Sequence, residues 1–164
     1  RLLITLMLIN DGVLHSCLFY PSFQFKKNRS EYYRQLTSVR ERGTYEEWIE
    51  FFCNSLLESA KDSVGSLKNL VDLHNRSTAT ITENLGRTAA NGQRLLGILG
   101  EHPIVDTAFI AAQLDIGRST ASSLVKSFEE LGILRPLDES RQRYRQYGYE
   151  EYLSILREDA EPIR

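Results

Sequence analysis

Two groups of side chains have the types and spacings that suit contact with phosphate groups. The first is a short polar cluster with one guanidinium and three hydroxyls: Arg118, Ser119, Thr120 and Ser123. The second places a guanidinium at every other position: Arg141, Arg143 and Arg145. Guanidinium and hydroxyl groups are the side chains that bond to phosphates and base edges in complexes with nucleic acid. These seven residues are therefore the candidates for such contacts in the second half of the chain.

The spacing of the remaining reactive side chains predicts neither a metal site nor a catalytic set. His15 and Cys17 are two residues apart and have no further ligands nearby, which argues against zinc. Cys17 and Cys53 form no Cys-x-x-Cys pair, and we expect both thiols to be buried. No Ser-His-Asp arrangement can be argued from spacing.

Glycine and proline residues mark the ends of the helices and strands that must position these side chains. In order, we expect helices over 91–99, 106–114 and 118–131, strands over 133–136 and 142–147, and a closing helix over 149–157. Asp106 is the expected N-cap of the second helix. Three helices followed by a β-hairpin predict a winged helix-turn-helix over residues 86–164.

The polar cluster lies in a segment that resembles the recognition helix of bacterial winged-helix regulators. The resemblance covers residues 118–126 and continues over 128–134, which resemble the route into the wing. It implies that the first group contacts bases and phosphates in the major groove, and that the arginines of the second group hold the wing against the backbone. From Arg118 to Tyr147 the net charge is only +2. A winged helix that binds protein is therefore an equal alternative.

The first half of the chain is predicted to be helical. Residues 2–9 are apolar and end at Gly12; they are far short of the roughly 20 residues that cross a bilayer, so we expect a core helix. A second helix is expected from Ser22 to Gly43. A long helix then begins at a capping box of Thr44 and Glu47. Its expected inner face is Trp48, Phe52, Leu56, Ala60, Val64, Leu67, Val71 and His74.

The helical pattern weakens around residues 76–90, where we place a domain boundary. This predicts a helical domain with a linker helix over 1–85 and the winged helix over 86–164, in a mainly α fold. The chain begins at Arg1 in the middle of a helical pattern and without an initiator Met. We therefore expect it to be the C-terminal part of a longer protein.

The first half also resembles the second half of a Fic domain. The matching segments are residues 1–9, Leu14, residues 18–20, residues 27–33 (Lys-Asn-Arg-Ser-Glu-Tyr-Tyr), Val39-Arg40, Gly43 and residues 48–52 (Trp-Ile-Glu-Phe-Phe). Many bacterial Fic proteins carry a winged helix behind this domain, so the resemblance spans nearly the whole chain. It implies a parent protein adenylyltransferase that uses ATP and Mg²⁺ to transfer AMP to a protein hydroxyl.

The Fic signature is a His, an acid, Gly-Asn-Gly-Arg and a final Arg three residues further on, and its part from the His to Gly-Asn-Gly-Arg is missing from this sequence. None of His15, His74 and His102 is followed by it. The resemblance matches Arg1 to the last Arg of the signature and places Tyr20 and Asn28 at the nucleotide cleft. We expect no catalytic residue in this chain, no stable cofactor binding and no AMP transfer by the chain alone.

Composition sets the remaining expectations. Hydrophobic residues make up 41% and charged residues 26% of the 164 residues, and the net charge is −2. These values are typical of a globular protein and give no global attraction to nucleic acid. We expect a cytoplasmic protein with a protein substrate, possible DNA contacts, a possible homodimer and no membrane partner. The alternative function is a DNA-binding transcriptional regulator with a helical dimerisation domain.

Overall fold

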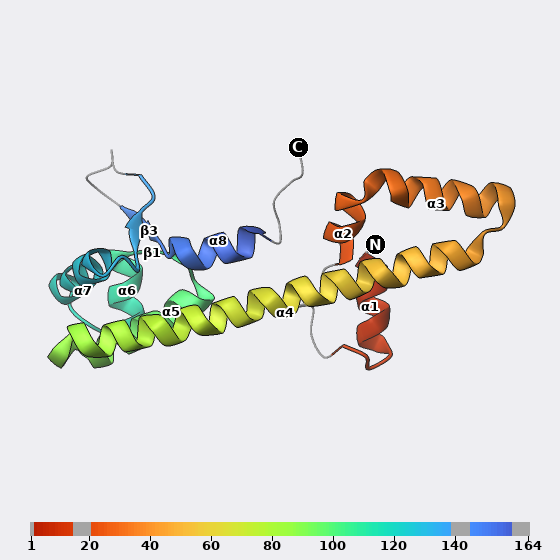
Figure 1. The fold of residues 1–164 in the computed structure, drawn as a ribbon. Helices are drawn as coiled ribbons and strands as arrows, with labels where there is room; N and C mark the ends of the chain where they lie inside the picture. The colour runs from red at the N-terminus through yellow and green to blue at the C-terminus, as the bar shows by residue number, and fades with distance from the viewer. Residues whose placement is uncertain (1, 15–20, 139–144, 159–164) are drawn as a thin grey trace. The chain divides into compact units, whose positions relative to one another are not determined.

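The computed structural model describes residues 2–14, 21–138 and 145–158, and it is mainly helical (Figure 1). The described residues form eight α-helices, one short 3₁₀ helix and one three-stranded antiparallel sheet. This confirms the mainly α prediction. The chain divides into two compact units, Arg1–Lys68 with Glu158–Arg164, and Asn69–Arg157. The division lies within one helix, before the 76–90 region where the sequence pattern weakens.

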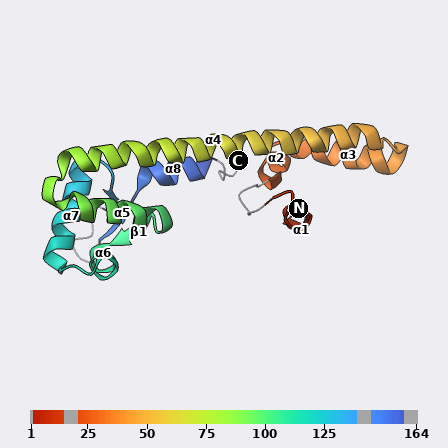
Figure 2. The ribbon, with the colours of Figure 1, turned by 90° about the horizontal axis from the view of Figure 1, so that it is seen from below.

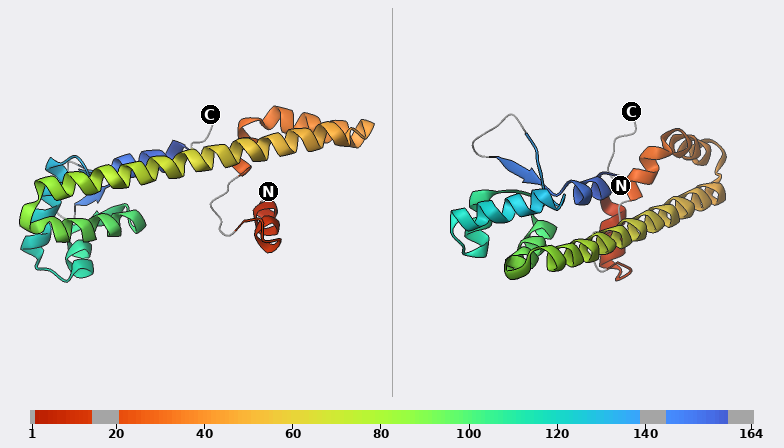
Figure 3. Two further views of the ribbon diagram at one scale, coloured as in Figure 1. Left: turned by 60° about the horizontal axis from the view of Figure 1, so that its bottom comes forward. Right: turned by 60° about the vertical axis from the view of Figure 1, so that its left-hand side comes forward.

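The first unit contains helix α1 (Leu2–Asn10), α2 (Pro21–Lys27), α3 (Arg29–Arg42) and the first part of α4 (Tyr45–Asn84). Its centre is an aromatic cluster around Phe25, which is fully buried. The ring centroids of Tyr32 and Phe52 lie 5.4 and 5.7 Å from that of Phe25. Aromatic pairs at such distances contribute beyond the area that they bury. The cluster therefore holds α2, α3 and α4 together in this unit. Figure 3 shows the backbone of these helices.

Three local predictions for this unit were wrong. The single helix expected from Ser22 is two helices, separated at Asn28, whose φ of −104° and ψ of 39° interrupt the helical backbone. The expected capping box is replaced by a side-chain bond, since the Thr44 hydroxyl lies 2.6 Å from Ser38 Oγ. Cys53 is exposed rather than buried. Cys17 lies outside the described residues.

Helix α1 is not the buried core helix that its apolar sequence predicts. Leu3, Leu6 and Met7 are 64%, 49% and 55% exposed. Among its described side chains only Thr5 is buried. A helix that is apolar on all sides needs cover on all sides, and the described part of the unit leaves these side chains uncovered.

The second unit is built from short elements around the end of α4. They are the 3₁₀ helix η1 (Gly86–Thr88), α5 (Ala89–Glu101), β1 (Ile104–Asp106), α6 (Thr107–Leu114), α7 (Arg118–Glu130), β2 (Arg135–Pro136), β3 (Gln146–Gly148) and α8 (Glu150–Glu158). The helices match the predicted ones closely, and α4 continues to Asn84, beyond the expected weakening at residue 76.

The small sheet has the strand order β1-β3-β2 and is antiparallel throughout. Val105 pairs with Tyr147, and Arg135 pairs with Gly148. The strands of the predicted hairpin are shorter than expected in their described parts, and β1 was not predicted at all. The expected strand positions 142–144 lie outside the described residues.

The core of the second unit forms where α5, α6 and α7 meet the last turns of α4 (Figure 2). Ile81 of α4, Leu99 of α5 and Phe128 of α7 are fully buried. Gly92 of α5 permits the close approach, because a Cβ built there would lie only 2.8 Å from Ile81 Cγ2 and from Leu85 Cδ1. The helix pair therefore depends on the missing side chain at this position.

A substitution at Gly92 tests this dependence. Gly92→Ala should lower the free energy of unfolding by about 1–3 kcal/mol, the usual cost of overpacking a core. Gly97→Ala is the matched control, because Gly97 is in the same helix and a Cβ added there would have no atom within 4 Å. It should raise stability by about 0.5–1 kcal/mol. Urea unfolding followed by circular dichroism measures both, and equal stabilities of the two variants would contradict the close-contact account.

A buried hydrogen bond joins α4 to the start of α8. Ser77 Oγ and Tyr149 Oη lie 2.7 Å apart, and both residues are buried. Burial raises the pKa of the Tyr149 phenol above its ordinary value, while the bond to Ser77 acts in the opposite direction. Next to it, Arg76 and Glu151 form an exposed ion pair of 2.8 Å.

The raised pKa of Tyr149 predicts a dependence of stability on alkaline pH. The folded state holds the phenol proton more tightly than the unfolded chain, so this contribution is complete below the unfolded pKa of about 10 and is lost as the pH rises through the folded value. Tyr149→Phe should therefore weaken the alkaline loss of unfolding free energy. Tyr45→Phe, at an exposed tyrosine, should leave the wild-type pH profile unchanged. Parallel profiles for all three proteins would contradict the assignment.

Candidate nucleic-acid interface

The polar cluster predicted to contact phosphates lies on the exposed face of α7. Gly117, with φ −64° and ψ 148°, precedes the helix, and its carbonyl accepts the first bond from the N–H of Ala121. The opposite face of α7 is apolar and buried, which fixes the rotation of the helix about its axis. Its buried residues are Ala121, Leu124, Val125 and Phe128. All four predicted residues of this helix are exposed: Arg118, Ser119, Thr120 and Ser123.

The start of α7 borders a hollow of about 370 Å³ that it shares with α6 and β3. The hollow is lined by Asp106, Thr107, Ala108, Arg118, Ser122, Arg145 and Tyr147. Arg118 and Arg145 are 27 positions apart in sequence, and the pairing of β3 with β1 brings Arg145 to the edge of this hollow. The structure thus brings together one residue from each predicted group. Arg141 and Arg143 lie outside the described residues.

Helix α6 begins at the wall of the same hollow. The Asp106 Oδ1 accepts a hydrogen bond from the backbone N–H of Phe109 at 2.7 Å, which confirms the predicted N-cap. A helix N-terminus carries a partial positive charge from its free N–H groups. Two guanidinium groups and this helix start therefore give the hollow an attraction for anions, which the Asp106 carboxylate reduces.

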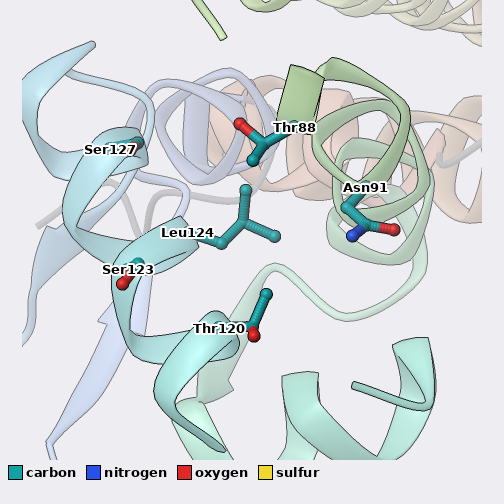
Figure 4. A pocket seen from close by; sticks show the side chains of 6 residues that line it. All are labelled: Thr88, Asn91, Thr120, Ser123, Leu124 and Ser127. Carbon is teal, nitrogen blue, oxygen red and sulfur yellow. The ribbon is translucent and has the colours of Figure 1, made fainter. Parts of the chain in front are cut away.

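A second, smaller hollow of about 70 Å³ lies on the other side of α7 (Figure 4). It is lined by Thr88, Asn91, Thr120, Ser123, Leu124 and Ser127. Thr120 and Ser123 therefore border the start of α5, while Arg118 borders the start of α6. Ser119 lines neither hollow. The predicted cluster is thus divided over two sides of one helix.

The charge of this surface is concentrated at the N-terminal end of α7. Arg118 forms no ion pair within the part of the chain that the structure describes. Farther along the helix, Lys126 lies 3.8 Å from Glu130, so its charge is partly offset there. An approaching polyanion would meet the most favourable potential beside Arg118.

Sequence reasoning missed several residues that border Arg118. Ser122 lines the same hollow and lies four positions after Arg118, the helical spacing that places two side chains on one face. That spacing could have identified it. Thr107 and Ala108 line the hollow as well, but their position depends on the fold of β1 and α6, which no short-range pattern reveals.

In the first unit, Asn28 borders a polar hollow of about 310 Å³. The other lining residues are Gln24, Glu31, Phe51, Asn54, Ser55 and Glu58. Asn28 is exposed, and its side-chain amide donates to the Gln24 carbonyl at 3.3 Å. The Gln24 side chain in turn donates to Asp62. Arg1 and Tyr20, the other two predicted nucleotide contacts, lie outside the described residues.

The carboxylates of this hollow do not suit a phosphate group. The hydrogen bond from Arg34 lowers the pKa of the Glu31 carboxyl below its usual value, with a smaller contribution from Gln35. Glu31 therefore stays ionised at neutral pH. Amide groups and the Phe51 ring could instead contact a base or a sugar, which need hydrogen bonds and a flat apolar surface.

Two further findings concern metal binding and membrane insertion by the described residues. They contain no group of three or more His, Cys, Asp or Glu side chains arranged to hold a metal ion. None of their helices combines the length and the apolar character needed to cross a bilayer.

No protein-family model matches the sequence.

Proposed function

We propose that Asn69–Arg157 forms a winged helix-turn-helix that binds double-stranded DNA, with α7 as the recognition helix. The order of the elements supports this proposal: α5, β1, α6 and α7 are followed by β2 and β3, and β1 completes the small sheet. In such a module the second helix of the helix-turn-helix enters the major groove while the first crosses the backbone. Here these helices are α7 and α6.

The observation that carries the proposal is the meeting of Arg118 and Arg145 at one hollow beside the start of α6. One guanidinium comes from the proposed recognition helix and the other from the residue directly before strand β3. Contacts with phosphates supply most of the affinity in protein–DNA complexes. A duplex backbone that follows this hollow would meet both charges.

The side chains of α7 imply modest discrimination between bases. Its exposed face offers mainly hydroxyl groups, which bond to several bases, while Arg118 and Lys126 are the two exposed cations of this helix that can bond to guanine. We therefore propose binding that is dominated by phosphates and depends strongly on salt.

Replacing both arginines tests the DNA proposal. Arg118→Ala with Arg145→Ala should weaken binding to a random duplex at least tenfold and reduce the slope of log K against log salt by about 2, one unit for each phosphate contact. Arg157→Ala is the control, because that exposed arginine lies on α8 and pairs with Glu150 at 3.2 Å. Fluorescence anisotropy measures both. Unchanged affinity in the double variant would contradict the assigned surface and favour a protein-binding winged helix.

We propose a second function for the first unit, as part of a Fic-type protein adenylyltransferase. The support is the hollow beside Asn28, whose amide and aromatic lining suits an adenosine. The exposed leucines of α1 also suit a helix that the rest of a Fic domain would cover. The described residues contain no group of three or more His, Cys, Asp or Glu side chains arranged to hold a metal ion, and we assign none of them to Mg²⁺. We therefore assign no step of AMP transfer to this chain.

Adenosine binding tests the role of Asn28. Titration of the chain with adenosine should shift the amide signals of Asn28 and Asn54 in NMR spectra, and Asn28→Ala should weaken these shifts. The exposed Asn69→Ala is the control, since Asn69 is distant in sequence from the hollow and does not line it. Incubation of the chain with labelled ATP should leave proteins unlabelled. Uniform shifts in all variants, or AMP labelling by the chain, would contradict this proposal.

A further inference from the structure

The side chain of Tyr147 is buried, yet its hydroxyl has no hydrogen-bond partner among the residues that the structure describes. Only 7% of Tyr147 is exposed, and no described residue forms a hydrogen bond with its hydroxyl. The two tyrosines that follow it differ in this respect, since Tyr149 bonds to Ser77 and Tyr152 donates to the Gly100 carbonyl. Buried tyrosine hydroxyls usually have a partner. The partner of Tyr147 is therefore expected from outside these residues.

Tyr147 faces the hollow of about 370 Å³ beside the start of α7. Tyr147 and Arg145 both line this hollow, whereas Gln146 between them does not. Such alternation is expected of extended chain, in which every second side chain points to the same side. Tyr147 lies in the central strand of the sheet, paired with Val105 on one side and Pro136 on the other. With the strand held on both edges, the exposed part of Tyr147 is directed to the hollow.

The other groups around the hollow attract an anion that has several acceptor oxygens. Arg118 and Arg145 each contribute a guanidinium, and Ser122 contributes a hydroxyl one turn after Arg118. Thr107 and Ala108 are the first two residues of α6 and also line the hollow. The first N–H groups of a helix have no partner within it and favour negative charge. Cations, hydroxyls and a helix start thus surround one space.

A phosphate group matches this set of donors better than a carboxylate does. A carboxylate has two oxygens, whereas a phosphate presents enough oxygens to accept from two guanidinium groups and a phenol at the same time. Of the described residues that line the hollow, only Asp106 is acidic. One oxygen of its carboxylate already accepts from the Phe109 N–H at 2.7 Å. The two arginines therefore outweigh the single acid.

We propose that the hollow holds one phosphate group, which accepts hydrogen bonds from the Tyr147 hydroxyl and from the guanidinium groups of Arg118 and Arg145. The phosphate is supplied by the backbone of a bound duplex or by a free phosphate compound. The first source rests on the DNA binding proposed above, and the second does not. With either source, the Tyr147 hydroxyl serves to bind a ligand and its ring serves to pack the sheet.

Tyr147→Phe tests the site, because it removes one oxygen and keeps the ring. Titration of the full chain with inorganic phosphate, at constant ionic strength, should give saturable shifts of the Thr107 and Ala108 amide signals in NMR spectra. Loss of a hydrogen bond to a charged group should raise the dissociation constant for phosphate about tenfold in the variant. The urea midpoint should stay at the wild-type value, because this hydroxyl has no partner among the described residues.

Tyr152→Phe is the matched control in the same unit. The Tyr152 hydroxyl donates to the Gly100 carbonyl at 3.0 Å, and Tyr152 does not line the hollow. This variant should therefore lower the urea midpoint and leave the dissociation constant for phosphate unchanged. The two tyrosine variants thus have opposite expected results, which separates a binding role from a structural one.

Duplex binding identifies the source of the phosphate. If the backbone supplies it, Tyr147→Phe should weaken binding to a random duplex about tenfold and leave the slope of log K against log salt unchanged, because the hydroxyl carries no charge. Wild-type affinity for the duplex in this variant, together with weakened phosphate binding, assigns the site to a free phosphate compound. A wild-type chain that binds phosphate but no duplex makes the same assignment and contradicts the DNA proposal alone.

Three results would overturn the phosphate site. The first is a wild-type chain whose amide signals show no saturable response to phosphate. The second is a Tyr147→Phe variant with the wild-type dissociation constant for phosphate. The third is a Tyr147→Phe variant that is also less stable, or a Tyr152→Phe variant that binds phosphate equally weakly, since either would assign the effect to the fold.

Discussion

The close packing of α5 against the last turns of α4 is the constraint on which the second unit depends. Gly92 lets the two helices approach until a single added carbon would contact Ile81 and Leu85. This approach buries Ile81 and sets the position of α5, against which α6 packs. Helix α7 packs on α6 in turn. The orientation of the exposed face of α7 therefore depends on successive helix contacts that begin at Gly92. A displacement of α5 would therefore also displace α6 and α7, because protein interiors are packed as densely as organic crystals.

The elements of the second unit could largely be predicted because their signals are local. Asp106 caps α6 through its own side chain, and Gly132 ends the segment after α7 with a φ of 72°, a conformation that glycine adopts without strain. Strand β1 could not be predicted, because three residues after Pro103 carry no periodicity. It exists only through pairing with β3, more than forty residues later. Long-range pairing of this kind leaves no local trace.

The prediction for the long helix α4 failed in the opposite way, because the sequence indicated an end that the structure does not have. Polar and β-branched residues after position 75 indicate a boundary, but α4 continues to Asn84. Contacts made by neighbouring elements outweigh the weak propensity there, since Gln93 donates to the Thr78 carbonyl and Tyr149 bonds to Ser77. The predicted inner face of α4 was right at its start, where Trp48 and Phe52 are half-buried and pack against Tyr32 and Phe25, and wrong farther along the helix. Ser55 and Ser59 are buried where α4 faces the rest of its unit, and Val64 and Leu67 are exposed. Of the predicted site, Arg118 and Arg145 are brought to one hollow, while Thr120 and Ser123 border another.

Asp106 belongs to two elements at once, as the last residue of β1 and the cap of α6. Its backbone is held in register with Gln146 while its side chain holds Phe109. No loop separates the strand from the helix, so an inserted or deleted residue here would shift either the strand register or the start of the helix. Changes of chain length at this corner should therefore destabilise the second unit. Because no loop separates β1 from α6, the corner is also a poor place to attach a tag or to join another protein.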